Sequence, residues 1–238
     1  LQFYLSPNYT RCDRPTSASN LDVPSPRYLP DHPMSDSPRP VTLEDVEEAR
    51  DRIGDAIYTS PCPRSETLSN RLDADVRLKL ENLQRTGSFK ERGARNKLMT
   101  LSDHDRERGV IAASAGNHAQ AVAYHGTELG IDSKIVMPEG TPLVKVTRTR
   151  RYGAEVVLTG SNYDEAYAAA RTIAREEDRS FIHPFDDRAV IAGQGTISLE
   201  LLEQEVDPDV VVIAVGGGGL IAGMGTALKA KLDDVRVG

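Results

Sequence analysis

A repeated alternation of short apolar segments and longer helical segments constrains the fold of this chain most strongly. Segments 109–113, 133–137 and 155–158 predict strands, and segments 117–129 and 141–152 predict the helices between them. The pattern continues with predicted helices at 163–177, 191–205 and from about 220, and predicted strands at 180–183 and 210–215. Apolar strands joined by helices indicate a parallel sheet that is covered on both faces.

Three more elements are predicted ahead of this alternation. Thr42 resembles an N-cap with Asp45 as an approximate capping box, so a helix is expected over 43–53. Alternating residues predict a strand over 77–81, and a helix is expected over 92–101.

The first 40 residues differ in composition from the rest of the chain. They contain eight prolines, and at this density proline interrupts any regular helix or strand pattern. We therefore expect residues 1–40 to be disordered. The chain begins at Leu1, and Met34 is expected to be the natural start. Residues 233–238 resemble the beginning of a strand that has been cut off, and we expect the chain to be a fragment of a longer protein.

Composition excludes several functional classes. A net charge of −7 does not favour a nucleic-acid or anionic-membrane partner. No apolar run approaches the roughly 20 residues of a membrane span. Cys12 and Cys62 are too few for a disulfide framework or a zinc site, so the cytoplasm is the expected compartment.

Four consecutive glycines, Gly216, Gly217, Gly218 and Gly219, follow the strand predicted at 210–215. Their unobstructed N–H groups can converge on an anion, and the next helix points its positive end to the same place. A flexible turn is the alternative, but four glycines cost more backbone entropy than a simple connection needs. The glycines therefore predict a phosphate site.

Lys90 lies between a turn of small residues and a predicted helix, directly after Phe89. A lysine is usually a solvated surface residue. A buried lysine amine instead has a lowered pKa and can attack an aldehyde. The position of Lys90 leaves both interpretations open.

The segment Ser114-Ala115-Gly116-Asn117-His118 follows a strand and begins a helix, where backbone donors can bind a carboxylate. Alternatively, Ser114 or Asn117 simply caps the helix. We expect His118 to be a structural hydrogen-bonding residue rather than a catalytic base. A metal site is not expected, because His183 and the adjacent Asp186 and Asp187 lack ligand spacing.

Four stretches together resemble the serine/threonine dehydratase family, whose members use pyridoxal phosphate (PLP). Lys79–Ala94 resembles the PLP-attachment signature, and Ser114–Gln120 resembles the substrate loop. His183–Asp187, with 190–196, is similar to the family's next stretch, and Gly216–Leu220 matches its phosphate loop. The resemblance runs from about Val41 to the end of the chain.

The resemblance implies a tryptophan-synthase-β-like α/β fold, PLP fold type II, with parallel sheets, flanking helices and a smaller domain inserted in a larger one. A catalytic domain is expected over 41–238, with its smaller subdomain at roughly 84–185 and its larger domain incomplete at the C-terminal end.

The resemblance also implies a role for each matching residue. Lys90 holds PLP covalently and is the catalytic residue, and no metal is expected. The implied cofactor-binding residues are Phe89, Lys90, Asn117, Gly216, Gly217, Gly218, Gly219 and Leu220. The implied substrate-binding residues are Ser88, Ser114, Asn117 and His118, with Thr86 close by.

The implied reaction is the β-elimination of L-threonine, with L-serine as a further substrate, to a 2-oxo acid and ammonia. Lys90 takes the Cα proton, and the β-hydroxyl leaves. The partner is a small amino acid, a homo-oligomer is expected, and isoleucine biosynthesis is the expected setting beside a catabolic one.

The same family includes serine racemases, so racemisation of serine is the close alternative to dehydration that the resemblance implies. Racemases of this family use a serine in the substrate loop as a second acid and base, and Ala115 stands there in this chain. Phe185 stands where they carry asparagine. Both differences favour dehydration. A catalytically silent fragment and a binder of a different phosphate ligand stay open as alternatives.

Overall fold

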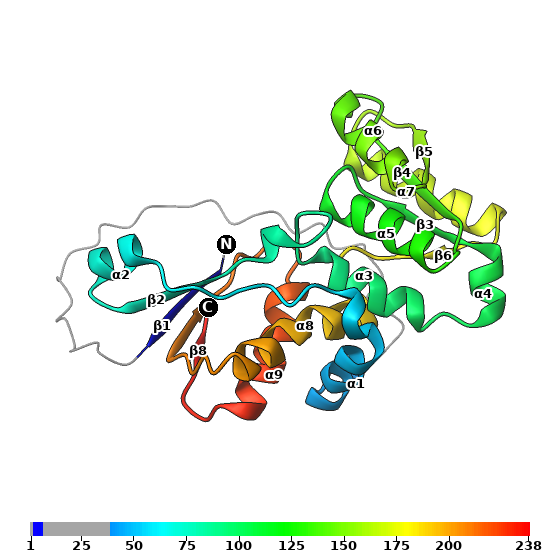
Figure 1. The fold of residues 1–238 in the computed structure, drawn as a ribbon. Coiled ribbons are helices and arrows are strands. Elements are labelled where there is room, and N and C mark those ends of the chain that lie inside the picture. The colour runs from blue at the N-terminus through cyan, green and yellow to red at the C-terminus, as the bar shows by residue number, and fades with distance from the viewer. Residues whose placement is uncertain (1, 7–38) are drawn as a thin grey trace, which may run out of the picture.

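The computed structural model describes residues 2–6 and 39–238, which form two four-stranded sheets in separate lobes (Figure 1). Residues 7–38 of the segment predicted to be disordered lie outside the described residues. In chain order the elements are β1 (Gln2–Ser6), α1 (Leu43–Ile53), η1 (Gly54–Ala56), α2 (Glu66–Leu72), β2 (Asp75–Lys79), η2 (Glu81–Leu83), α3 (Lys90–Met99), α4 (Asp103–Arg108), β3 (Val110–Ala113), α5 (Asn117–Glu128), β4 (Ser133–Met137), α6 (Leu143–Arg151), β5 (Glu155–Leu158), α7 (Tyr163–Glu176), β6 (Ser180–Phe181), α8 (Arg188–Glu203), β7 (Val210–Val212), α9 (Gly219–Lys231) and β8 (Arg236–Val237).

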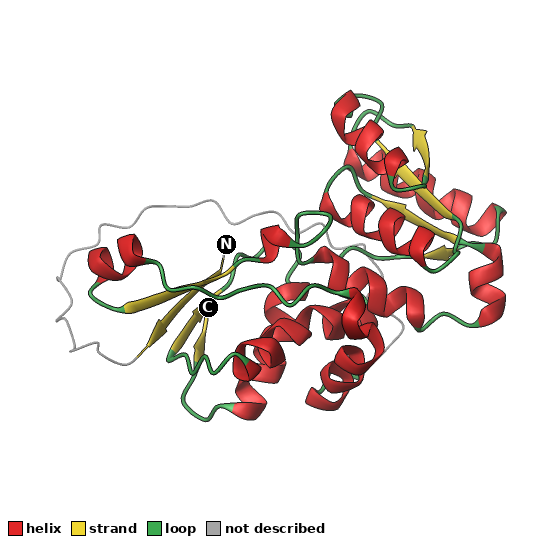
Figure 2. Ribbon diagram, viewed as in Figure 1, coloured by secondary structure: helices red, strands yellow, loops and turns green. Residues whose placement is uncertain are grey.

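The sheet with strand order β5-β4-β3-β6 is parallel throughout, as the alternating pattern predicts. Successive residues of β3 enter opposite cores: Ala112 packs with α5, and Ile111 and Ala113 pack with α7. Both faces are therefore covered by helices, which explains why this strand is wholly apolar (Figure 2). This sheet uses residues 110–181, and the predicted subdomain boundary at 84–185 stays a prediction.

The sheet with order β2-β1-β7-β8 departs from the sequence-based prediction. β1 pairs antiparallel with both β2 and β7, whereas β7 and β8 are parallel. We expected no strand among the first 40 residues, and this was wrong for Gln2–Ser6. The proline argument did not apply there, because the first proline is Pro7 and the aromatic residues Phe3 and Tyr4 are of types that favour strands.

Helix α3 connects the two lobes, because it packs against α5 on one side and against α8 on the other. Helices α8 and α9 pack together and form a core with β7, which includes Ile197, Met224 and Val211. Lys90 is the first residue of α3 and therefore lies where the lobes meet.

Most predicted helices and strands lie within a few residues of their observed positions. The Thr42 capping box is present, and its helix spans Leu43–Ile53 as predicted. Helices α2 and α4 were missed because both are short and lack an apolar period, although Ser65 and Ser102 cap them. None of the described helices is long and apolar enough to cross a membrane.

Candidate active site

Lys90 has a half-buried side chain whose amine faces a backbone carbonyl. Its Nζ donates a hydrogen bond of 2.6 Å to the Pro184 oxygen, and no carboxylate of the described residues forms an ion pair with it. Burial lowers the pKa of Lys90 from 10.5 to about 8. A substantial share of this amine is therefore neutral near physiological pH, as a nucleophile or base requires.

The segment from Ile182 to Phe185 is where three of the predicted motifs meet. Lys90 of α3 bonds to Pro184, and the His118 Nε2 of α5 donates to the Ile182 oxygen at 3.0 Å. A Cβ placed on Gly217 would overlap the Phe185 ring. The fold thus brings together residues that lie more than 100 positions apart in the sequence.

His118 is buried and serves as a hydrogen-bond donor to the backbone. Its pKa is lowered to about 3, chiefly by burial, while the hydrogen bond to Ile182 opposes this shift and the nearby charges of Lys90 and His183 add to it. The ring is therefore neutral at pH 7 and carries its proton on Nε2, since the Ile182 carbonyl only accepts. This supports the structural role predicted for His118, and its substrate contact stays a prediction.

The glycine run forms the turn between β7 and α9. Gly218 has a φ of 85°, a left-handed conformation that favours glycine, and α9 begins at Gly219. Gly216 and Gly217 are exposed, and the close approach of Phe185 leaves no space for a side chain on Gly217. The turn has the geometry of an anion site: backbone donors without side chains at the positive end of a helix.

The remaining predicted site residues lie beside Lys90, at the start of α5 or next to the glycine turn. Ser88 is buried, and its Oγ accepts the Lys90 N–H at 3.3 Å. Asn117 is exposed at the first turn of α5, and the Ser114 Oγ accepts the Gly116 N–H at 3.2 Å. Phe89 and Leu220 pack in the core that α8 and α9 share. Their roles toward cofactor and substrate stay predictions.

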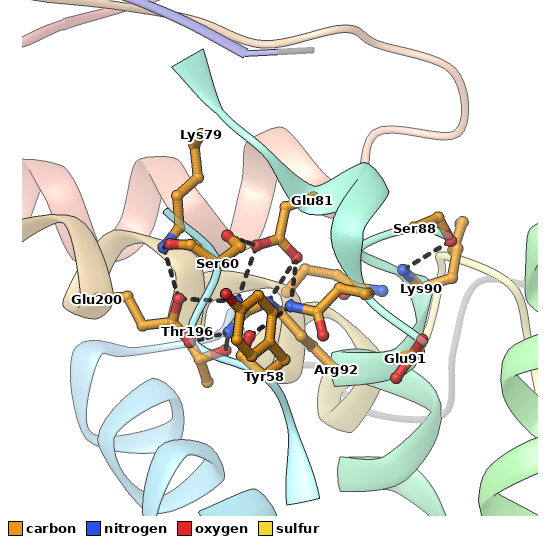
Figure 3. A network of polar contacts seen from close by, with 12 residues as sticks. Tyr58, Ser60, Lys79, Glu81, Ser88, Lys90, Glu91, Arg92, Thr196 and Glu200 are labelled. Atoms are coloured by element: carbon orange, nitrogen blue, oxygen red, sulfur yellow. Dashed lines mark hydrogen bonds and ion pairs between the residues drawn. The ribbon is translucent and has the colours of Figure 1, made fainter. Parts of the chain in front are cut away.

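A cluster of buried charges lies behind Lys90, and the sequence analysis missed it (Figure 3). This charged cluster consists of Lys79, Glu81, Arg92 and Glu200. Arg92 is fully buried and donates to Glu81 at 2.8 Å and to Glu200 at 2.6 Å. Burial lowers the pKa of Arg92, but the two carboxylates outweigh burial and raise it.

The charged cluster ties the start of α3 to α8 and β2, two residues away from Lys90. Two positive and two negative charges balance, which compensates the cost of burying them. Glu200 was the available signal, because it is the single charged residue among Ile197, Leu199, Leu201 and Leu202 and a charge on an apolar helix requires a buried partner.

The residues at this site fit PLP. A desolvated lysine amine can bond the aldehyde, and the glycine turn can bind the phosphate. The N-terminus of α5, with Asn117 exposed on it, adds donors for further oxygens.

The sequence comparisons agree with this geometry. The sequence model of the pyridoxal-phosphate dependent enzyme family matches residues 53–237, so the chain belongs to this family. It is 50% identical over 198 residues to the L-threonine dehydratase catabolic TdcB of Escherichia coli (strain K12), covering 83% of this chain and 60% of that protein. It is 50% identical over 197 residues to the L-threonine ammonia-lyase of Thermotoga maritima, covering 83% and 49%.

Solved structures give the same relationship. The processed form of threonine deaminase isoform 2 from Solanum lycopersicum matches with a TM-score of 0.79 and 41% identity. Maize serine racemase matches with a TM-score of 0.80 and 32% identity. Each match covers 84% of this chain and 60% of the other.

These findings confirm the resemblance to the serine/threonine dehydratases and the fold class, PLP fold type II. PLP as the family's cofactor is confirmed as well. The chain spans 60% or less of the length of the curated relatives compared above. The activity of the whole protein is therefore a matter for proposal.

Proposed function

We propose that this chain carries the catalytic core of a threonine ammonia-lyase, which converts L-threonine, and also L-serine, to the 2-oxo acid and ammonia. The observation that carries the proposal is the convergence on residues 182–185 of the Lys90 amine, the α5 N-terminus and the glycine turn. The relatives named for threonine deamination support the substrate.

PLP, when bound, supplies a conjugated ring that stabilises negative charge at the substrate Cα. Lys90 acts as the base that takes the Cα proton onto Nζ, and its pKa of about 8 makes the neutral amine accessible at neutral pH. The Pro184 carbonyl accepts an N–H of Lys90 and orients the amine. The Cβ–O bond breaks as the hydroxyl takes up a proton and leaves as water, so the proton taken from Cα and the proton given to the hydroxyl balance.

The glycine turn and the start of α9 would hold the phosphate through backbone N–H groups, and the Phe185 ring packs on Gly217 and gives the turn a rigid wall. Asn117 and Ser114 present polar groups at the start of α5, where the substrate carboxylate meets the positive end of the helix. We assign these roles because the same residues match the phosphate loop and the substrate loop of the family.

Dehydration is favoured over racemisation by Ala115. This residue lies between Ser114 and the α5 N-terminus, and its methyl group cannot carry a proton to the second face of the substrate. Racemisation requires such a second acid on the opposite face. The likeness to serine racemases therefore supports a shared fold and cofactor, and elimination is the proposed outcome.

The test is the formation of 2-oxobutanoate from L-threonine with added PLP. This chain and the full-length protein are assayed in parallel, with Lys90→Ala as the test variant and the exposed Lys145→Ala as a matched lysine control. We expect Lys90→Ala to abolish product and Lys145→Ala to leave it unchanged. D-serine from L-serine without 2-oxo acid would favour racemisation, and no product from the full-length protein would contradict both.

The proposal for the cellular setting rests on the composition of the chain and on the names of its relatives. We place the protein in the cytoplasm as a homo-oligomer that acts on free amino acids. The catabolic names of relatives support degradation of threonine over isoleucine biosynthesis. Cell fractionation and light scattering of the full-length protein test compartment and assembly.

A further inference from the structure

Glu91, the residue after Lys90, is a fully buried carboxylate that holds the preceding turn closed. Its Oε1 accepts the backbone N–H of Thr86, five residues earlier. Its Oε2 lies 3.5 Å from the Nε2 of His125 in α5, and that ring is also fully buried. Glu91 therefore contacts both the turn that precedes Lys90 and the helix that begins at Asn117.

Arg95 determines which nitrogen of His125 carries the proton. Its Nη1 lies 3.4 Å from the His125 Nδ1, and a guanidinium only donates. Nδ1 is therefore the acceptor, and the proton of the neutral ring is on Nε2, facing Glu91. The Nε2–H of His125 thus faces the Glu91 Oε2 at 3.5 Å, a contact longer than a normal hydrogen bond, and Thr86 donates to the other carboxylate oxygen.

The charge states agree with this direction. Burial lowers the pKa of His125, and the contact with Glu91 opposes burial without overcoming it, so the ring is neutral at pH 7. Burial raises the pKa of Glu91, but the contact with the His125 ring and the hydrogen bond from Thr86 outweigh it and hold that pKa below its usual range. Glu91 is thus an ionised acceptor, and hydrogen bonds to an ionised group are the stronger kind.

A second contact joins the same two segments. Arg85 donates from Nη1 to the Tyr124 hydroxyl at 2.8 Å, and the ring of Tyr124 packs edge-on against His125 at 4.9 Å between centroids. Neighbouring residues of the turn, Arg85 and Thr86, are therefore linked to neighbouring residues of α5.

We propose that Glu91 and His125 are positioning residues that fix the Thr86–Ser88 turn against α5, and thereby the distance between two sides of the substrate pocket. The inference rests on the proposed function, because Ser88 and the start of α5 are the expected substrate contacts. Glu91 and His125 touch neither Lys90 Nζ nor the glycine turn in the contacts described. Their loss should therefore weaken substrate binding more than cofactor binding.

The variants test the charge of Glu91 and the N–H group of His125 separately. Glu91→Gln keeps the size of the side chain and removes its charge. His125→Leu removes the donor, and His125→Gln restores an N–H that can face Glu91. Exposed Glu107→Gln serves as a matched control for the loss of a carboxylate.

The first readout is amide hydrogen exchange in the apo protein, which does not depend on activity. Losing an ionised acceptor should raise the exchange rate of the Thr86 amide about tenfold in Glu91→Gln. His125→Leu should have a smaller effect, and His125→Gln should return the rate toward wild type. Faster exchange over the whole of α3 and α5 would show a merely structural role and overturn the proposal, as would an unchanged Thr86 rate.

The second readout uses the full-length protein with PLP and L-threonine. We expect KM to rise about tenfold in Glu91→Gln with a smaller change in kcat and unchanged PLP affinity, measured by fluorescence titration. Parallel loss of PLP affinity and kcat would overturn the proposal. If the wild-type protein forms no 2-oxobutanoate, the proposed function fails, while the Thr86 exchange rates still decide whether the pair holds the turn.

Discussion

Two lysines eleven positions apart, one fully buried and one half-buried, illustrate two ways in which a fold uses the same side chain. Lys79 is fully buried, and its Nζ donates to Glu200 at 2.6 Å, to the Ser60 carbonyl at 2.7 Å and to Gln204 at 3.1 Å. Lys90 is half-buried, and its Nζ donates to the Pro184 carbonyl. The difference is a carboxylate: Lys79 has one, and Lys90 has none among the described residues.

This difference decides what each amine can do. The ion pair with Glu200 makes Lys79 part of the scaffold. Desolvation without a countercharge lowers the pKa of Lys90 to about 8 and makes its neutral form available for chemistry. The charged cluster and the active site are adjacent, so the scaffold that holds the start of α3 also holds the reactive lysine.

Replacing each lysine by methionine should separate the two roles most strongly. Lys79→Met breaks a buried pair and should lower the free energy of unfolding by about 3–5 kcal/mol. Lys90→Met removes a poorly solvated charge, so the free energy of unfolding should stay the same or rise slightly. Urea denaturation of both variants without PLP measures the effect, and equal losses would contradict the distinction.

Gly217→Ala tests the close approach of Phe185 to the glycine turn. The added Cβ overlaps the ring, and such overpacking should cost about 1–3 kcal/mol of folding free energy and weaken PLP binding. Gly216→Ala is the matched control for the folding free energy alone, because a Cβ there meets nothing within 4 Å. Combining Gly217→Ala with Phe185→Ala should recover stability, and no recovery would place the strain elsewhere.

The pH dependence of Lys90 reactivity tests its lowered pKa. In the folded protein without PLP, labelling of Lys90 by acetic anhydride should rise about tenfold per pH unit below pH 8 and level off above it. In the denatured protein the midpoint should return to near 10.5. A folded-state midpoint near 10.5 would mean that Lys90 is solvated.

The same shift has a defined consequence for stability. Between pH 8 and 10.5 the unfolded chain binds a proton at Lys90 that the folded chain does not. The free energy of unfolding should therefore increase with pH across this interval and lose that increase as the pH falls to 8. Lys90→Met should lack this component in pH-dependent denaturation.

Thr42→Ala should have the smallest effect, because the capping box lies at the start of α1. Losing the hydroxyl that bonds Asp45 should cost about 1 kcal/mol of folding free energy. Thr42→Ser, which keeps the hydroxyl, should behave as wild type. A change in PLP affinity in Thr42→Ala would mean that α1 is coupled to the site.

The sequence by itself determined the strand–helix alternation and the motifs at its turns. Helix 43–53 and strands 133–137 and 155–158 were predicted with their observed bounds, because capping residues and apolar periods are local signals. The motif resemblance singled out Lys90 and the glycine turn, and the sequence comparisons confirmed the family. Strand β1 was missed, because its pairing depends on partners far along the chain.

Only the tertiary structure decided which residues meet. Residues 182–185 bring together Lys90, His118 and the glycine turn, although no local pattern connects them. The pairing of Arg92 with Glu200 and of Glu91 with His125 likewise joins different helices. The physical reason is that burial and charge compensation are properties of a three-dimensional neighbourhood, so the pKa of a lysine follows from what the fold places around its amine.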